Sequence, residues 1–331
     1  MSDFAPLLER FFTDRLMLQR QASPHTISSY RDTFKLLLEF ACERSGHPPS
    51  KLGIIDLDAA TIADFLHSLE TVRGNSTVTR NVRLAAIHSF FTYAAMQAPE
   101  SAAVIQRVLA IPSKRVDRAI VSFLTSDESS ALISAPNRKT WLGRRDHVLM
   151  LVAVHTGLRV SEITRLTAQD VHLGPGPYVR CMGKGRKERC TPLTRVAVQA
   201  LHSWLAELSP HDDDPVFPTR QGKSLSRDAV AHLVARHVAT ATVVCPSMGT
   251  KNVTPHTLRH STAMAMLRSG VDVSVISLWL GHESTASTTM YLHADMSLKE
   301  HALALTAPTS GDGAMKRYRA PDTLIAFLDD L

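Results

Sequence analysis

The stretch TGLRVSEI, at residues 156–163, places an arginine where one helix ends and the next begins. Gly157 predicts the end of a buried helix that begins near Arg144, because glycine readily adopts the left-handed conformation of a C-cap. Arg159 then lies beside the free backbone N–H groups of a new helix, an arrangement that suits a phosphate. Glu162, one turn later, can orient the guanidinium. A surface arginine at a turn between helices is the alternative.

The motif PHTLRH, at residues 255–260, supplies a second arginine and two histidines. Pro255 predicts the first position of a helix. His256 and Arg259 are three residues apart and therefore share one face of that helix. The pair offers a guanidinium and an imidazole that can move a proton near neutral pH. We expect His260 to lie behind the site. A capped helix with an exposed histidine and arginine is the alternative.

Two residues near the C-terminal end complete the set. In LWLGH, residues 278–282, an apolar helix is expected to end at Gly281, so that His282 projects from a turn and can hydrogen-bond a phosphate oxygen. Tyr291 is a candidate nucleophile. A free phenol has a pKa of about 10, and nearby guanidiniums would favour the phenolate. Taken alone, His282 is a residue just past a helix end and Tyr291 a core or interface aromatic.

A basic loop separates two short predicted strands. Residues 177–191 predict a β-hairpin whose tip, residues 183–187, has the sequence GKGRK. Lys184 is the candidate catalytic cation of this loop, with Lys187 as the alternative. Arg186 and Lys187 are candidate DNA contacts.

Composition indicates a globular protein with a polyanionic partner. The chain has 331 residues, of which 44% are hydrophobic, a net charge of +6 and a pI of about 9.3. That length fits two domains, and that hydrophobic content allows a packed core. Residues 180–189 alone carry a net charge of +4. Clustered lysine and arginine displace counterions from phosphates, which favours nucleic acid as the partner.

Several other classes of protein are disfavoured. The four cysteines form no CxxC pair, which argues against a disulfide framework or a zinc site and favours a reducing cytoplasm. No apolar run reaches the roughly 18 residues that span a bilayer, and acidic residues near the N-terminus argue against a signal peptide. A GxxxxGK[ST] phosphate loop and a carboxylate cluster for paired Mg²⁺ are both missing from the sequence, so we expect no cofactor and no metal.

Two domains and a tail are predicted. The boundaries are 1–112 for a helical DNA-binding domain, 113–122 for a linker, 123–305 for a catalytic domain and 306–331 for a tail. Helices of the first domain are expected at 4–20, 23–44, 58–69 and 76–94, by apolar periodicity and capping residues.

Two arginines of the first domain are candidate DNA contacts. Arg80 and Arg83 share a face of the fourth expected helix, which can lie in the major groove. A solvated basic face is the alternative.

Together, these motifs resemble the tyrosine recombinase (phage integrase) family. The resemblance in order and separation covers about residues 123–301, and the first domain is similar to the family's core-binding domain in length and helix content. It implies a mainly α fold with a small β-sheet, in which a helical N-terminal core-binding domain precedes an α+β catalytic domain.

The resemblance also implies roles for residues that bind the phosphate. Arg159 and Arg259 match the two arginines that bind the scissile phosphate. His282 matches the histidine or tryptophan that hydrogen-bonds it, and Glu162 matches a commonly acidic support position.

The remaining implied roles concern proton transfer and bond formation. Lys184 matches the lysine that protonates the leaving 5′ oxygen, and His256 matches the histidine or lysine that acts as an acid or base. Tyr291 matches the nucleophile, which forms a 3′-phosphotyrosine that a partner strand later resolves.

The implied function is site-specific recombination of double-stranded DNA at inverted-repeat sites by a homo-oligomer of two to four subunits. It would serve the integration, excision or transposition of a mobile element. A type IB topoisomerase and a catalytically silent DNA-binding regulator are the alternatives. The tail predicts a short amphipathic helix at 322–331, which docks either on a neighbouring subunit, as in the family, or on its own.

Overall fold

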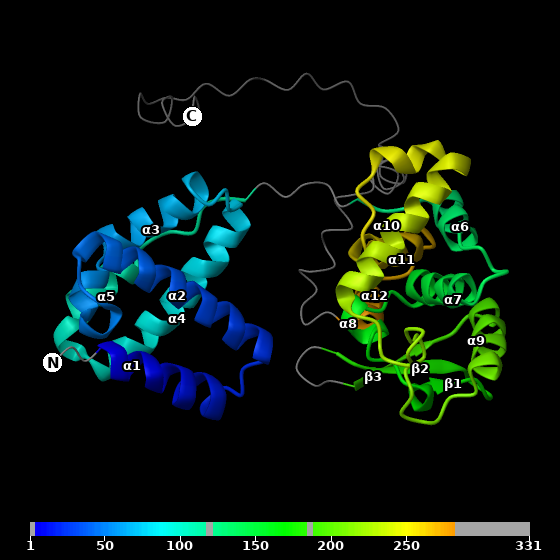
Figure 1. The fold of residues 1–331 in the computed structure, drawn as a ribbon, viewed down its shortest axis with the longest axis horizontal. Coiled ribbons are helices and arrows are strands. Elements are labelled where there is room, and N and C mark those ends of the chain that lie inside the picture. The colour runs from blue at the N-terminus through cyan, green and yellow to red at the C-terminus, as the bar shows by residue number, and fades with distance from the viewer. Residues whose placement is uncertain (1–3, 117–121, 184–187, 282–331) are drawn as a thin grey trace, which may run out of the picture. The chain divides into compact units, whose positions relative to one another are not determined.

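The structure is a computed structural model that describes residues 4–116, 122–183 and 188–281 (Figure 1). The chain divides into two compact units, Met1–Arg118 and Ala119–Leu331. The described elements are helices and one three-stranded sheet, so the expected mainly α fold class is confirmed. Among the described helices, none has both the length and the apolar character required to cross a membrane.

Every described secondary-structure element of the first unit is a helix. Serine or aspartate side chains cap three of its helices, with Ser23, Asp58 and Ser76 each accepting a hydrogen bond from a backbone N–H three residues later. Its elements are α1 (Phe4–Arg10), η1 (Phe11–Gln19), α2 (Pro24–Ser45), η2 (Pro49–Lys51), η3 (Ile54–Leu57), α3 (Ala59–Thr71), α4 (Thr77–Gln97), η4 (Pro99–Ser101) and α5 (Ala102–Leu109).

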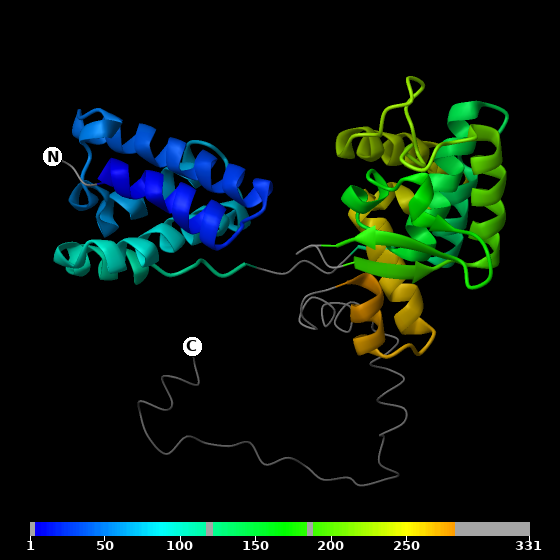
Figure 2. The same ribbon diagram turned by 90° about the horizontal axis from the view of Figure 1, so that it is seen from below.

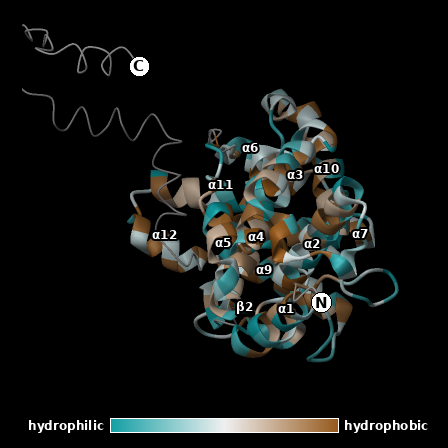
Figure 3. Ribbon diagram, turned by 90° about the vertical axis from the view of Figure 1, so that its left-hand side faces the viewer, coloured by the Kyte–Doolittle hydropathy of each residue, from teal (hydrophilic) through white to brown (hydrophobic). Residues whose placement is uncertain are grey.

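The prediction of a single α-helix over residues 4–20 is wrong. After Arg10 the α-helix gives way to the π-helix η1. The neighbouring rings of Phe11 and Phe12 both contact Phe34, and the wider π-helical turn accommodates both in one aromatic cluster. Helices of both units show brown and teal sides, as expected of helices that bury one face (Figure 3).

Pro112 and Lys114, in the segment that follows α5, bind side chains of α3 and α4. Arg80 donates from Nη1 to the Pro112 carbonyl at 3.1 Å, and Asn81 exchanges hydrogen bonds with the backbone of Lys114 at 2.7 and 3.0 Å. The Lys114 ammonium also pairs with Glu70 at 2.6 Å. The first residues of the predicted linker are therefore held against the helical unit.

The second unit combines a small sheet with helices. The strands β1 (Val171–His172), β2 (Tyr178–Met182) and β3 (Glu188–Pro192) form an antiparallel sheet in that order (Figure 2). The hairpin β2–β3 follows the prediction, whereas β1 was not predicted, because two residues are too few to show a period. In the register, Cys181 lies opposite Arg189 and Arg180 lies opposite Cys190.

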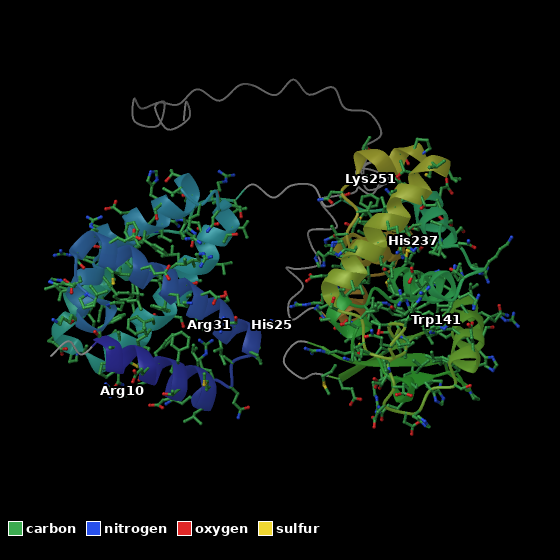
Figure 4. All side chains as sticks on the ribbon, viewed as in Figure 1. Arg10, His25, Arg31, Trp141, His237 and Lys251 are labelled. Carbon is green, nitrogen blue, oxygen red and sulfur yellow. The ribbon has the colours of Figure 1, made fainter. Side chains whose placement is uncertain are left out.

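Helix α7 is central to this unit. It begins at Trp141, labelled in Figure 4, and is three residues longer at its start than predicted, because Thr140 caps it by accepting from the Gly143 N–H. The described helical elements of this unit are α6 (Ser126–Ser134), α7 (Trp141–Thr156), α8 (Val160–Ile163), η5 (Ala168–Asp170), α9 (Arg195–Leu208), α10 (Arg227–Val244), η7 (Pro246–Thr250), α11 (Pro255–Arg268) and α12 (Val273–Leu280).

The new helix expected at Arg159 is a single short turn in the structure. Helix α8 ends at Ile163, and the chain turns so that Ile163 and Leu166 enter the hydrophobic core. The backbone N–H of Val216 then donates to the Leu166 carbonyl at 2.9 Å, and that contact replaces a further helical turn.

Candidate active site

Two helix ends meet at the candidate site. Helices α7 and α12 both terminate in glycines with left-handed backbone, Gly157 at φ +65° and Gly281 at φ +63°. A Cβ on Gly157 would lie 2.7 Å from a Leu280 methyl group, so the close approach of the two ends also requires glycine there. Trp279 donates from its indole nitrogen to the Thr156 carbonyl at 3.0 Å and joins the same two ends.

The guanidinium of Arg259 lies between these helix ends. It donates from Nη1 to the Gly157 carbonyl at 2.7 Å and from Nη2 to the Leu280 carbonyl at 2.6 Å, and the residue is 1% exposed. The C-terminal carbonyls of a helix carry partial negative charge, which favours a cation at this place. Helix α11 delivers the arginine, and its predicted start at Pro255, with Thr254 as the cap, is present.

The guanidinium of Arg159 reaches the same place from the start of α8. It donates from Nη2 to the Gly281 carbonyl at 2.9 Å and from Nη1 to Glu162 at 3.0 Å. Its side chain remains 28% exposed. A phosphate at this point would meet a cation that is fixed in direction but accessible to solvent.

Glu162 is the buried carboxylate behind Arg159. Its side chain is 3% exposed, and Oε2 accepts from the Arg159 backbone N–H at 2.7 Å. Burial alone would raise the pKa of Glu162, but hydrogen bonds from Arg189 and Arg159 and the charges of both arginines hold that pKa below its ordinary value. The carboxylate is therefore ionised at neutral pH, consistent with the orienting role expected from the sequence.

Arg189 is a residue of this site that sequence reasoning missed. It projects from β3 and binds Glu162 with both terminal nitrogens, each at 2.8 Å. Burial alone would lower its pKa, and the contact with Glu162 raises that pKa instead. A signal was present: strand alternation places Arg189 on the same inward face as Thr191, and a buried arginine there needs an anionic partner.

His256 lies on the surface near the two arginines. Its ring contacts that of His260 edge to face, with centroids 4.3 Å apart. Partial enclosure of the ring lowers the pKa of His256, and the charges of Arg259 and Arg159 lower it further. The neutral imidazole therefore predominates at pH 7. His260 lies one turn further along α11, behind His256.

The remaining predicted residues divide into two groups. Arg80 is 7% exposed and donates to the Pro112 carbonyl, so its head group is engaged within the first unit, and Arg83 is half-buried. The other five predicted residues lie outside the described residues; they are Lys184, Arg186, Lys187, His282 and Tyr291.

Comparison with protein families identifies the chain. Residues 122–297 match the family described as "Phage integrase family", and residues 8–98 match "Phage integrase, N-terminal SAM-like domain". The chain belongs to the phage integrase family. It is therefore a tyrosine recombinase by descent, and the resemblance stated from its motifs is confirmed.

Full-length relatives agree with the family match. The Sinorhizobium fredii protein named integrase/recombinase y4rC is 53% identical over 330 residues, which cover 100% of this chain and 99% of that protein. The tyrosine recombinase XerC of Chlamydia muridarum is 33% identical over 87% of this chain and 94% of its own.

A solved structure shares the fold of this tyrosine recombinase. The XerH site-specific recombinase, bound to a palindromic difH substrate in a post-cleavage complex, matches with a TM-score of 0.68. The match covers 86% of this chain and 81% of XerH at 22% identity, and at that identity it is a likeness of fold.

Proposed function

We propose that this protein cuts and rejoins DNA strands at specific sites through a covalent 3′-phosphotyrosine. The observation that carries the proposal is the pair of guanidiniums, Arg159 and Arg259, fixed at the joined ends of α7 and α12 in a chain of this family. The rearrangement would integrate, excise or transpose a mobile element.

Cleavage would proceed by one substitution at phosphorus. The phenol oxygen of Tyr291 forms a bond to the scissile phosphorus, and the bond from phosphorus to the 5′ oxygen breaks. His256 takes the phenol proton, and Lys184 gives a proton to the leaving 5′ oxygen. A 5′-hydroxyl from a partner strand then attacks the phosphotyrosine and reverses these steps, so the phosphoester bond is conserved.

The two arginines would stabilise the charge that develops on the phosphate oxygens. Each is held by backbone carbonyls before DNA arrives, so little reorganisation is needed in the transition state. His282 would add a hydrogen bond to the same phosphate. Glu162 would fix the direction of Arg159 without contacting DNA.

The state of His256 supports a role as proton acceptor. Its lowered pKa favours the neutral imidazole at pH 7, and a neutral imidazole can accept the phenol proton. The nearby guanidiniums that lower this pKa would also favour the phenolate form of Tyr291.

The partner would be double-stranded DNA with inverted-repeat sites. XerH, which shares the fold, is bound to a palindromic substrate, and a palindrome calls for two protomers related by a two-fold axis. Two such sites bring together four protomers. The basic hairpin residues Arg186 and Lys187, together with Arg83, are the proposed backbone contacts.

We further propose residues 1–112 as a core-binding domain, 113–122 as a linker, 123–305 as the catalytic domain and 306–331 as a docking tail. Work on chromosomal or element DNA would place the protein in the cytoplasm, which agrees with four cysteines that lack a CxxC pair.

A plasmid with two copies of the target site tests the function. The wild-type protein should yield two recombinant products, and Tyr291→Phe should bind the sites with equal affinity and yield none. Recombination by Tyr291→Phe would refute the assigned chemistry.

The same assay separates the alternatives. Loss of supercoils without exchanged products would identify topoisomerase activity. Site binding with neither relaxation nor exchange by the wild-type protein would identify a DNA-binding regulator.

A further inference from the structure

We infer that Arg189 is a positioning residue for strand cleavage, which fixes Arg159 by binding Glu162 and by packing against Gly281. The inference rests on the proposed function of Arg159 as a phosphate ligand. It adds a residue from the β2–β3 hairpin to a site otherwise built from helix ends.

Both carboxylate oxygens of Glu162 accept hydrogen bonds from Arg189 and from Arg159. Arg189 donates Nη1 to Oε1 and Nη2 to Oε2, each at 2.8 Å, while Arg159 donates Nη1 to Oε1 and its backbone N–H to Oε2. Each carboxylate oxygen therefore accepts one bond from each arginine. Without Arg189, a carboxylate that is 3% exposed would keep the bonds from Arg159 alone.

The second contact is with the end of α12. A Cβ on Gly281 would lie 2.9 Å from Arg189 Nη1, so the guanidinium packs directly on the glycine backbone. The carbonyl of that same glycine accepts from Arg159 Nη2 at 2.9 Å. Arg189 thus binds the carboxylate that orients Arg159 and packs against the glycine whose carbonyl accepts from Arg159.

The place of Arg189 in the sequence gives these contacts a consequence. It lies on β3, two residues after Lys187 and five after Lys184 in the basic hairpin loop. The bond to Glu162 therefore fixes β3, the strand that follows the proposed general acid in the sequence. Arg189 therefore joins the hairpin to the phosphate-binding arginines.

Lysine cannot replace this arginine, although it carries the same charge. A guanidinium presents two parallel N–H groups to the two carboxylate oxygens, whereas an ammonium is a single point donor. Arg180, on the other face of the sheet, is a control, because it pairs with Asp170 and Glu188 instead of with Glu162.

The test compares Arg189→Lys, Arg189→Met and Arg180→Met on a nicked duplex that traps the covalent intermediate. We expect single-turnover cleavage to fall about 10-fold for Arg189→Lys and about 100-fold for Arg189→Met, as for other residues that orient a functional group. Affinity for the site should change less than about 3-fold, and Arg180→Met should cleave like the wild type. Circular dichroism melting identifies any variant that fails to fold.

A double-mutant cycle provides the readout that a general structural role would not move. In the Glu162→Gln background, Arg189→Met should cost much less than in the wild type, because the two residues act as one unit. Guanidinium ion added to Arg189→Met should restore part of the cleavage rate.

Two results would overturn the inference: wild-type cleavage by both Arg189 variants, or fully additive losses in the cycle together with no rescue by guanidinium. Failure of the proposed function is distinguishable, since the wild-type protein would then trap no DNA at all.

Discussion

The second unit contains two buried carboxylates with similar partners and different surroundings. Glu162 accepts hydrogen bonds from Arg159 and Arg189, and Asp146 accepts from Arg145 at 2.8 and 3.0 Å, from Arg236 at 2.7 Å and from His237 at 2.9 Å. Both side chains are at most 3% exposed. Arg236 and His237 both lie on α10, where Figure 4 labels His237.

The difference lies in what the arginines touch at their other ends. Arg145 donates its remaining Nη1 to the Pro218 carbonyl, so the Asp146 cluster joins α7, α10 and a loop. Arg159 instead donates to Gly281 and keeps part of its surface accessible. Buried ion pairs of like composition can therefore stabilise a fold or orient a functional group, and their outer contacts decide which.

The largest effect should come from the site itself. Arg259→Gln is expected to reduce strand cleavage by about 10²-fold or more, because it removes preorganised positive charge from the phosphate site. Single-turnover trapping on a nicked duplex measures this rate. Arg236→Gln, which alters the Asp146 cluster, is the matched control and should cleave normally; equal losses in the two variants would erase the distinction.

The next effect should be on stability. Asp146→Asn is expected to lower the free energy of unfolding by about 2 kcal/mol, because it leaves buried donors without a full acceptor. Cleavage per folded molecule should remain unchanged. Urea denaturation measures the first quantity and active-fraction titration the second. A large loss of rate in the folded variant would show that the Asp146 cluster also serves the chemistry.

The same cluster predicts a dependence on pH. Burial alone would raise the pKa of Asp146, but His237 and Arg145 hold that pKa below its ordinary value. Its contribution to stability is therefore present above the unfolded pKa of about 3.9 and is lost as the pH falls through the folded value. The stability difference between the wild type and Asp146→Asn should shrink below about pH 4; a constant difference would contradict the assignment.

Glu162→Gln, in contrast to Asp146→Asn, should affect strand cleavage. Cleavage is expected to fall about 10-fold, in the range of residues that orient a functional group, and affinity for the DNA site should be retained. Gel-shift titration and single-turnover trapping separate the two quantities. A variant that cleaves at the wild-type rate would remove Glu162 from the site.

The smallest effect concerns His256. Its lowered pKa predicts an imidazole titration midpoint below the ordinary 6.5, with the neutral form favoured above it. Arg259→Gln should raise that midpoint, because it removes a nearby positive charge. Nuclear magnetic resonance of the ring protons measures both values. A wild-type midpoint at or above 6.5 would contradict the reported environment.

Much of the fold could be read from local sequence signals. Ser23, Gly157 and Pro255 mark helix boundaries that the structure contains, because capping depends on the residue and its immediate neighbours. The two-residue strand β1 and the π-helical η1 could not be read, since both depend on packing against distant residues.

The candidate site was readable where its residues sit in compact motifs. Arg159, Glu162 and Arg259 lie next to helix boundaries that the sequence marks, and the structure joins these boundaries. Arg189 was missed because its partner is 27 residues away and on another element. Arg80 was read as an exposed contact because helical spacing does not reveal that the chain after α5 returns to cover it.

The most direct test of the account is the chemical identity of the protein–DNA link. A nicked duplex with the target site should trap the wild-type protein, and peptide mass spectrometry should find the 3′-phosphate on Tyr291. Attachment at another residue, or a complex that dissociates fully in denaturant, would contradict the phosphate site built around Arg159 and Arg259.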